Sequence, residues 1–278
     1  MEVLFPEKPD EIWAMWKKYP KAKLMAGGTD LLVNVVNRTI QPQALLCLER
    51  VRELQQINRD ESEIRIGATL THQRLLDSAI VKEEFPVLWE ALAVLGSPPI
   101  RHAGTIGGNI CTASPAGDTL PALYVLDAQV EIYSAQGRRR LPIHEFITGP
   151  GCTALEQGEI LGGVIIPLQL YKASCGFFKI GHRKALAIAV VSLAAIWQTD
   201  RDRILRKVKF AWGSVGPKIM VFPELEKWLM GKPLNEQVLQ EAKKLVSQSL
   251  LPIDDIRATA DYRKKSAGNL LLKLLDCR

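Results

Sequence analysis

Two glycine-rich segments of this 278-residue chain combine bare backbone with short polar side chains. The first is 26-AGGTD-30, and the second is 104-GTIGGN-109, which opens the longer stretch GTIGGNICTASPAGDTLPAL. Glycine lets a ligand lie directly against the main chain, and consecutive unshielded N–H groups form a concave anion site. Taken singly, each segment is better explained as a plain tight turn. Taken together, the two could hold a diphosphate from both sides, with hydrogen bonds from Thr29, Thr105, Asn109 and Thr112.

Neither segment has the spacing of a familiar nucleotide site. The chain contains no GxxxxGK[ST], which argues against a P-loop nucleotidase. It contains no GxGxxG between a strand and a helix, which argues against a Rossmann dinucleotide site. A diphosphate ligand would therefore need a different kind of fold.

Three further side chains could act beside such a ligand, and each has an ordinary alternative. Asp118 could accept hydrogen bonds from a cofactor, but from the residues alone an Asx-turn is the better explanation. Lys179 sits between two apolar residues and could simply extend its amine to water. Cys111 lies in the longer stretch that the second segment opens, and a small buried hydrophobe is its preferred interpretation.

Composition limits the class of protein. The net charge is +6, but the basic runs 138-RRR-140, 206-RKVK-209 and 262-YRKK-265 lie among acids without interleaved aromatics, which disfavours nucleic-acid binding. Five widely spaced cysteines form no CxxC pair, so we expect neither a disulfide framework nor a zinc site. No signal peptide is evident, and the most apolar helical-looking stretch, 185–197, is too short to span a bilayer. These features predict a cytoplasmic protein.

Strands and helices are mixed without regular alternation, which predicts an α+β fold. Gly96 is expected to end one helix, and Gln136-Gly137 to form the turn of a hairpin. The patterns predict helices near 9–19, 86–96, 235–250 and 262–275, strands near 63–71 and 160–167, a hairpin over 129–143, a strand–turn–helix or strand–turn–strand unit over 22–36, and a helix-covered sheet over 176–215.

Five ordered segments together resemble one family. These segments are AGGTDLL, TIGGNICTASPAGDTLPAL, GEILGGVIIP (158–167), GFFKIGHRKALAIAVVSLAA (176–195) and DIRATADYRKKSAGNLL (255–271). They resemble the medium, FAD-binding flavoprotein subunit of the molybdenum hydroxylases, the family of xanthine dehydrogenase and carbon monoxide dehydrogenase. The resemblance covers nearly the whole chain.

The resemblance implies a fold and a set of FAD contacts. The expected fold is a two-part FAD-binding domain of the vanillyl-alcohol-oxidase (PCMH) type over 1–170, with subdomains of about 1–55 and 56–170, followed by a smaller α+β domain over 171–278. The residues that match the family's FAD positions are Leu24, Met25, Ala26, Gly27, Gly28, Thr29, Asp30, Leu31, Leu95, Thr105, Ile106, Gly107, Gly108, Asn109, Thr112, Asp118, Leu161 and Lys179. The resemblance places Gly27-Gly28 on the pyrophosphate. It places Lys179 near the flavin, where the lysine's charge would favour the reduced form. It implies no catalytic side chain and no metal ligand on this chain.

The resemblance also implies partners. FAD is the only cofactor expected here, because the clustered cysteines that one branch of the family uses for an iron–sulfur cluster are absent. A [2Fe–2S] small subunit and a molybdopterin large subunit would complete a hetero-oligomer, and the acceptor would be NAD⁺ or another molecule. Two alternatives remain open: a stand-alone flavin oxidase of the same fold, and a non-catalytic scaffold.

Overall fold

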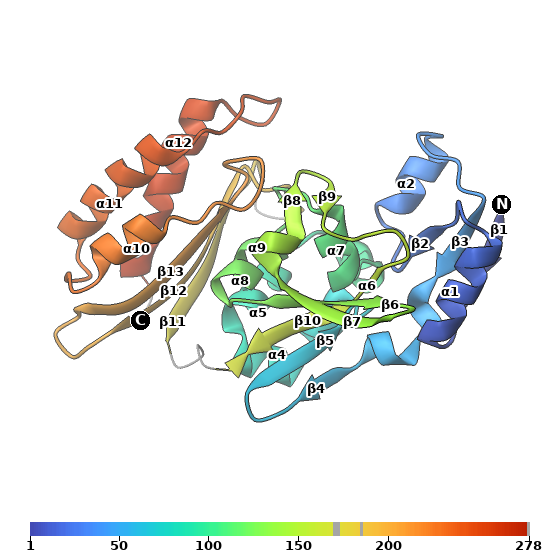
Figure 1. Ribbon diagram of the computed structural model, residues 1–278. Helices are drawn as coiled ribbons and strands as arrows, with labels where there is room; N and C mark the ends of the chain where they lie inside the picture. Colours follow the sequence, from blue (N-terminus) through green and yellow to red (C-terminus); the bar gives the residue numbers. More distant parts are fainter. Residues whose placement is uncertain (169–172, 184–185, 277–278) are drawn as a thin grey trace. The chain divides into compact units, whose positions relative to one another are not determined.

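The computed structural model describes residues 1–168, 173–183 and 186–276 of the chain (Figure 1). The chain divides into two compact units, of which the first comprises residues 1–75, 97–113 and 128–168. The second comprises 76–96, 114–127 and 169–278. The predicted domain boundary at 170 lies outside the described residues and stays a prediction. Cys277 also lies outside the described residues. The predicted mixture of helices and strands without regular alternation is confirmed.

The first unit begins with a small parallel sheet. Its strand order is β1 (Glu2–Leu4), β3 (Ala44–Cys47) and β2 (Lys23–Met25). Helix α1 (Pro9–Lys18) has proline at its start, acids in its first turn and lysines in its last, as the helix dipole favours. Its Ile12 is fully buried in the core beside the sheet. This confirms the predicted first helix.

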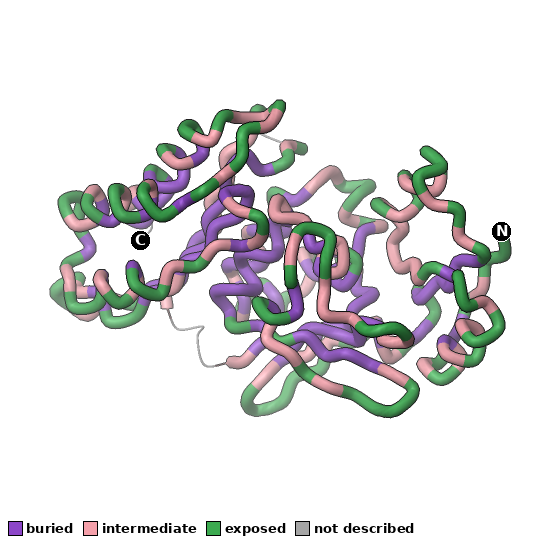
Figure 2. Tube along the Cα trace, turned by 45° about the horizontal axis from the view of Figure 1, so that its top comes forward, coloured by how far each residue is buried: buried purple, intermediate pink, exposed green. Residues whose placement is uncertain are grey.

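A five-stranded antiparallel sheet forms the centre of the first unit. Its order is β4 (Ile57–Arg59), β5 (Glu63–Gly67), β10 (Ile160–Pro167), β6 (Gln129–Ser134) and β7 (Gly137–Pro142). The middle strand β10 is buried along almost its whole length (Figure 2). The predicted hairpin is therefore confirmed as β6 and β7, and so are the strands β5 and β10.

The remaining elements of the first unit are short. They are α2 (Leu31–Val36), η1 (Leu48–Arg50), η2 (Arg52–Gln55), α6 (Pro98–Ala103), α7 (Ile106–Thr112), α9 (Ile143–Phe146), β8 (Ile147–Gly149) and β9 (Cys152–Thr153), with most of α3 (His72–Leu76). Of these, α2 follows directly on the first glycine-rich segment, and α7 begins inside the second.

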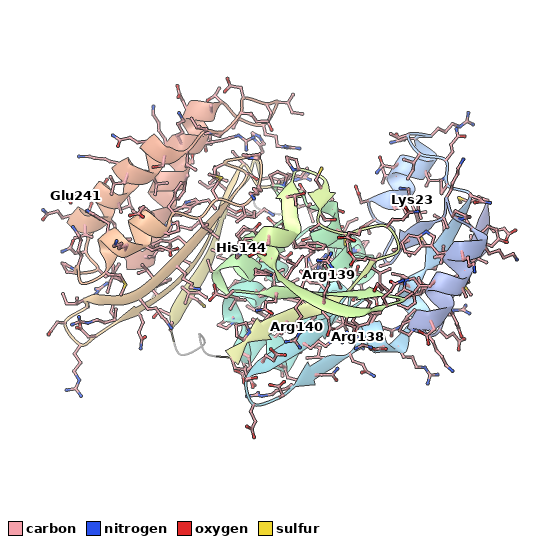
Figure 3. All side chains as sticks on the ribbon, viewed as in Figure 1. Lys23, Arg138, Arg139, Arg140, His144 and Glu241 are labelled. Carbon is pink, nitrogen blue, oxygen red and sulfur yellow. The ribbon has the colours of Figure 1, made fainter. Side chains whose placement is uncertain are left out.

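The three arginines of the run on β7, labelled in Figure 3, each have an acidic partner. Each guanidinium group forms an ion pair with a glutamate from a different part of the chain. The pairs are Arg138–Glu53 at 2.5 Å, Arg139–Glu159 at 2.7 Å and Arg140–Glu63 at 3.0 Å. The run is therefore a structural part of this sheet, consistent with our preference for surface charge over a nucleic-acid patch.

The second unit is built on a three-stranded antiparallel sheet, β11 (Ser174–Ile180), β12 (Val191–Thr199) and β13 (Leu205–Gly213). Helices pack on it from both sides: α5 (Pro86–Ala93) and α8 (Thr119–Val125) from one, and α10 (Pro223–Leu229), α11 (Glu236–Ser249) and α12 (Ala260–Leu270) from the other (Figure 1). Helix α4 (Ala79–Glu84) precedes α5, and η4 (Leu271–Leu275) ends the unit.

Helical covering of the central strand explains one misleading signal in the sequence. The stretch 185–197 is apolar enough to look helical, yet its second half is β12, whose residues Val191 to Trp197 are all buried. A strand buried on both faces shows a continuous apolar run, which periodicity alone does not separate from a buried helix. The helix expected to end at Gly96 ends at Ala93 instead.

The closing motif DIRATADYR stabilises the second unit. Arg263, nearly fully buried, donates hydrogen bonds to the carbonyls of Val190 and Ser214 and pairs with Asp255 at 2.7 Å. Desolvation opposes ionisation of Asp255, but hydrogen bonds from two backbone N–H groups and from Arg263 hold the pKa of its carboxyl at about 2. The motif thus joins the start of α12 to the loops that flank β12 and β13.

Candidate cofactor site

The first glycine-rich segment connects β2 to α2 and leaves its backbone donors exposed to a ligand. Gly28 has φ +70, a conformation that other residues rarely adopt. Within the described part of the chain, no hydrogen bond is recorded from the backbone N–H of Gly27, Gly28, Thr29 or Asp30. Four consecutive unpartnered donors fit the anion site that the sequence predicts here, and the binding of an anion by them stays a prediction.

The second glycine-rich segment is different from what we expected. Thr105 is the N-cap of α7, and its hydroxyl oxygen accepts a hydrogen bond from Gly108 N–H at 3.1 Å. The N–H groups of Ile106 and Gly107 donate to the carbonyls of Leu70 and Ala68, and Asn109 N–H donates to Thr105 O. The expectation of unshielded N–H groups is therefore wrong for this segment, because each of these donors already has a partner inside the protein.

The two segments nevertheless come together, backbone against backbone. A Cβ placed on Gly27 would lie 1.8 Å from the carbonyl oxygen of Ala103, so no residue with a side chain fits there. A Cβ on Gly104 would lie 3.4 Å from the hydroxyl of Thr29. Gly107 is constrained in the same way by Ala68, at 2.6 Å from its carbonyl oxygen. These glycines make room for protein, whereas Gly108 is exposed and meets only the Thr105 hydroxyl.

A histidine that sequence reasoning did not select supports this junction. His72 is buried, and its backbone N–H donates to Gly104 O at 2.9 Å. Its Cδ2 lies 3.2 Å from the position of a Cβ on Gly104. Burial, with a contribution from Arg101, lowers the pKa of His72 to about 4, so the imidazole is neutral at pH 7. Its Nδ1 is buried without a hydrogen-bond partner among the described residues. A single histidine among polar residues did not indicate from the sequence that His72 would be buried at this junction.

In the second unit, the structure joins Asp118 to Lys179. Lys179 Nζ lies 2.6 Å from Asp118 Oδ2 and also donates to Val94 O at 3.2 Å, next to the buried Leu95. Both side chains of the ion pair are only 9% exposed. Asp118 precedes α8 but makes no capping hydrogen bond, so the Asx-turn alternative is wrong. The alternative for Lys179, an amine extended to water, is wrong as well.

One carboxylate oxygen of Asp118 has no hydrogen-bond donor among the described residues. Its Oδ1 is buried without a partner among the described residues, which is costly for a carboxylate. Burial raises the pKa of Asp118 to about 6, against the opposing effect of Lys179. An orphaned acceptor of this kind fits a ligand that brings a hydroxyl or ring N–H.

The other predicted contacts divide between the units. The first unit holds 24–31, 105–109, Thr112 and Leu161, and the second holds Leu95, Asp118 and Lys179. Burial raises the pKa of the Cys111 thiol to about 12, so it is no nucleophile at neutral pH. Among the described residues no cluster of three metal-ligating side chains occurs. No helix that the structure describes is long and apolar enough to cross a membrane.

These observations fit FAD. In the first unit, the free N–H groups of 27–30 suit the diphosphate of FAD. In the second unit, the unpartnered carboxylate oxygen of Asp118 suits a hydroxyl or ring N–H donor. Which of the predicted side chains touch the cofactor stays a prediction.

Gly27→Ala tests the junction of the two segments. The methyl group would overlap Ala103 O, so we expect FAD-free protein to lose more than about 2 kcal/mol in its free energy of unfolding, with a parallel loss of bound flavin. Urea denaturation and flavin absorbance per chain measure the two effects. Gly108→Ala is the control and should change the stability by less than about 1 kcal/mol. Equal stability of the two variants would contradict the geometry.

Asp118→Asn tests the buried carboxyl. Its folded pKa, about 6, exceeds the unfolded value of 3.8, so the native state holds a proton between these values that the unfolded state releases. The stability contributed by this group is full below pH 4 and is lost as the pH rises through 6, at up to about 1.4 kcal/mol per pH unit.

Urea denaturation between pH 4 and 7 should therefore show wild type losing stability relative to Asp118→Asn as the pH rises. Asp127→Asn is the matched control, because Asp127 lies just beyond α8 and also pairs with a lysine, Lys209, but is half exposed. A difference between wild type and Asp118→Asn that does not vary with pH would rule out the raised pKa.

Comparison with known proteins identifies two family domains along the chain. Residues 1–169 match the family described as the FAD binding domain in molybdopterin dehydrogenase, and residues 176–277 match the CO dehydrogenase flavoprotein C-terminal domain. The chain is 30% identical over 262 residues to the nicotinate dehydrogenase FAD-subunit of Eubacterium barkeri, covering 93% of this chain and 88% of that protein. It is 31% identical over 246 residues to the xanthine dehydrogenase FAD-binding subunit of Escherichia coli O157:H7, covering 88% and 84%.

Solved structures give the same result. A chain of the Cu,Mo-CO dehydrogenase superimposes with a TM-score of 0.92 at 26% identity, covering 99% of this chain and 96% of that one. A chain of quinoline 2-oxidoreductase from Pseudomonas putida 86 gives 0.93 at 26% identity, covering 99% and 95%. The predicted FAD cofactor and oxidoreductase class are confirmed at the level of the family. The chain belongs to the family of FAD-binding subunits of the molybdenum-containing dehydrogenases.

Proposed function

We propose that this chain is the electron-transfer flavoprotein subunit of a multi-subunit molybdenum hydroxylase. When bound, FAD supplies the redox chemistry by which electrons from an iron–sulfur partner reach NAD⁺ or another acceptor. The protein's part is to hold the cofactor, shape its environment and offer no competing nucleophile. The observation that carries the proposal is the row of four unpartnered N–H groups at 27–30, in a chain whose first 169 residues match an FAD-binding domain.

The first glycine-rich segment would hold the diphosphate. Its N–H groups are donors of fixed direction, and they bind an anion without the entropic cost of ordering a lysine side chain. The segment keeps this form because Gly27 packs against Ala103 and because Leu32 N–H donates to Gly28 O at 2.9 Å. The second segment would then act as the wall that positions the first, rather than as a second set of donors.

Asp118 would accept a hydrogen bond from the cofactor through Oδ1. Lys179 occupies the other oxygen and so fixes the direction in which Oδ1 is free to accept. The charge of Lys179 is shared with Asp118 at 2.6 Å, which leaves less of it to favour a reduced, anionic flavin than the sequence suggested. Lys179 is thus proposed as a positioning residue for Asp118.

The relatives' names indicate the setting. Medium chains of carbon monoxide dehydrogenase and of glyceraldehyde dehydrogenase are among the relatives of this chain. By analogy we propose a hetero-oligomer in which a [2Fe–2S] small subunit and a molybdopterin large subunit accompany this chain, located in the cytoplasm.

Co-purification from the native host tests the function. We expect about one FAD per chain, together with iron–sulfur absorption from a partner. If NAD⁺ is the acceptor, anaerobic mixing of the complex with NADH should bleach the flavin, because the hydride transfer runs in both directions. Flavin that NADH leaves oxidised, but that an artificial one-electron acceptor reoxidises after substrate reduction, would assign a different acceptor.

Two results would contradict the proposal. Turnover of a small alcohol or phenol by the isolated chain would identify a stand-alone oxidase. Protein that remains colourless after incubation with FAD, while folded by circular dichroism, would identify a scaffold.

A further inference from the structure

No residue that lines a groove of the first unit is among those predicted to touch FAD. This groove has a volume of about 730 Å³ and lies between α1, the segment that follows it, and two loops of distant sequence. Its walls come from four short stretches: Trp13, Trp16 and Lys17; Pro20 to Lys23; Ile40 to Pro42; and Gln157 with Gly158. Pockets that bind small molecules have volumes of about 300–1,000 Å³. The groove is of the size that a nucleotide needs.

Two indoles form the apolar part of the groove. Trp13 and Trp16 are three residues apart on α1 and so project from the same side of the helix. Each is half-buried, with part of its surface against the core of the small parallel sheet. Trp13 Nε1 donates to Gly158 O at 2.8 Å, which fixes one loop against the helix. Trp16 also lines the groove, and no hydrogen bond of its Nε1 is recorded within the described chain.

Three lysines surround the indoles without a counter-charge. Lys17, Lys21 and Lys23 line the groove and are exposed, and no ion pair of theirs is recorded in the part of the chain that the structure describes. No residue that lines the groove is acidic. This contrasts with the arginines of β7, each of which has an acid partner. Lys18 is also exposed, but it lies over the ring of Tyr19 and does not line the groove.

We infer that this groove binds a planar aromatic anion of nucleotide size. An indole provides a face on which an aromatic ring stacks, and stacking of this kind contributes substantially to binding whatever the ring. Three uncompensated ammonium groups at the rim attract phosphate. Neither feature alone would select a nucleotide, but a base joined to phosphate satisfies both. The inference is independent of the proposed electron-transfer function, because no residue of the groove belongs to the predicted FAD contacts.

Calorimetric titration of full-length, FAD-loaded protein tests the inference with three probes. ADP carries both ring and phosphate, adenosine only the ring, and pyrophosphate only the phosphate. We expect ADP to bind at least about tenfold more tightly than either of the others, because both parts contribute. Loading with FAD first keeps ADP from the diphosphate site at 27–30.

Lys17→Glu and Lys18→Glu form a matched pair, since they make the same charge change on adjacent residues of one helix. Lys17→Glu should weaken ADP binding about tenfold or more, whereas Lys18→Glu should change it by less than about twofold. Trp16→Phe should weaken ADP binding but leave pyrophosphate binding unchanged. If Trp16→Phe does not fold by circular dichroism, the lysine pair decides.

Three outcomes would overturn the inference. Equal effects of the two lysine variants would mean that ADP senses only the general charge of the protein. The absence of binding heat at roughly 5 mM ADP would mean that no such site exists, since weaker affinity has no use at cellular concentrations. Binding of a glutamate-rich peptide in place of ADP would make the groove a protein-docking surface. If the chain fails to load FAD, the lysine pair still distinguishes ADP at the groove from ADP elsewhere.

Discussion

The close approach of Gly27 to the carbonyl of Ala103 is the constraint on which the rest of the candidate site depends. A residue with a Cβ would overlap that oxygen, so only glycine lets the turn after β2 lie against the segment before α7. A side chain at Gly27 would hold these two stretches of main chain apart. The N–H groups of 27–30 beside this contact have no partner among the described residues.

The second segment contributes rigidity rather than donors. Its N–H groups are bonded to Ala68, Leu70 and Thr105, so the start of α7 is joined to the loop after β5 and to its own cap. The neutral imidazole of His72 lies beneath Gly104 and extends the same framework. A binding loop held by such a framework loses little entropy when a ligand arrives. The Asp118–Lys179 pair of the second unit follows the same principle, since one carboxylate oxygen is fixed and the other is left to accept.

Local patterns in the sequence were sufficient to predict much of the fold. The proline and charges of α1, the alternation along β5 and the turn at Gly137 all act within a few residues. The two glycine-rich segments could be found as well, because glycine beside short polar residues is a local signal. Family resemblance then assigned them to FAD. The matching families confirm FAD as the cofactor, and its contacts with the two segments stay a prediction.

What the sequence could not supply were partners that lie far along the chain. The N–H groups of Ile106 and Gly107 looked free because their acceptors, Leu70 and Ala68, lie more than thirty residues earlier. Asp118 looked like a turn residue because Lys179, which neutralises it, lies 61 residues later. The apolar run before Trp197 looked helical because a strand covered on both faces has no alternation. In each case the tertiary partner, and not the local composition, decides the role.

The central claim is that the first glycine-rich segment binds the diphosphate and that the second only positions the first. This claim can be measured directly. Amide hydrogen exchange, resolved by residue with NMR in the presence and absence of FAD, compares the two segments in one experiment. We predict that FAD slows exchange at the N–H groups of 27–30, which are unpartnered without it, and leaves 106–109 nearly unchanged, because those groups are already bonded. Slowing at 106–109 with none at 27–30 would show that the second segment holds the diphosphate, and would contradict the account.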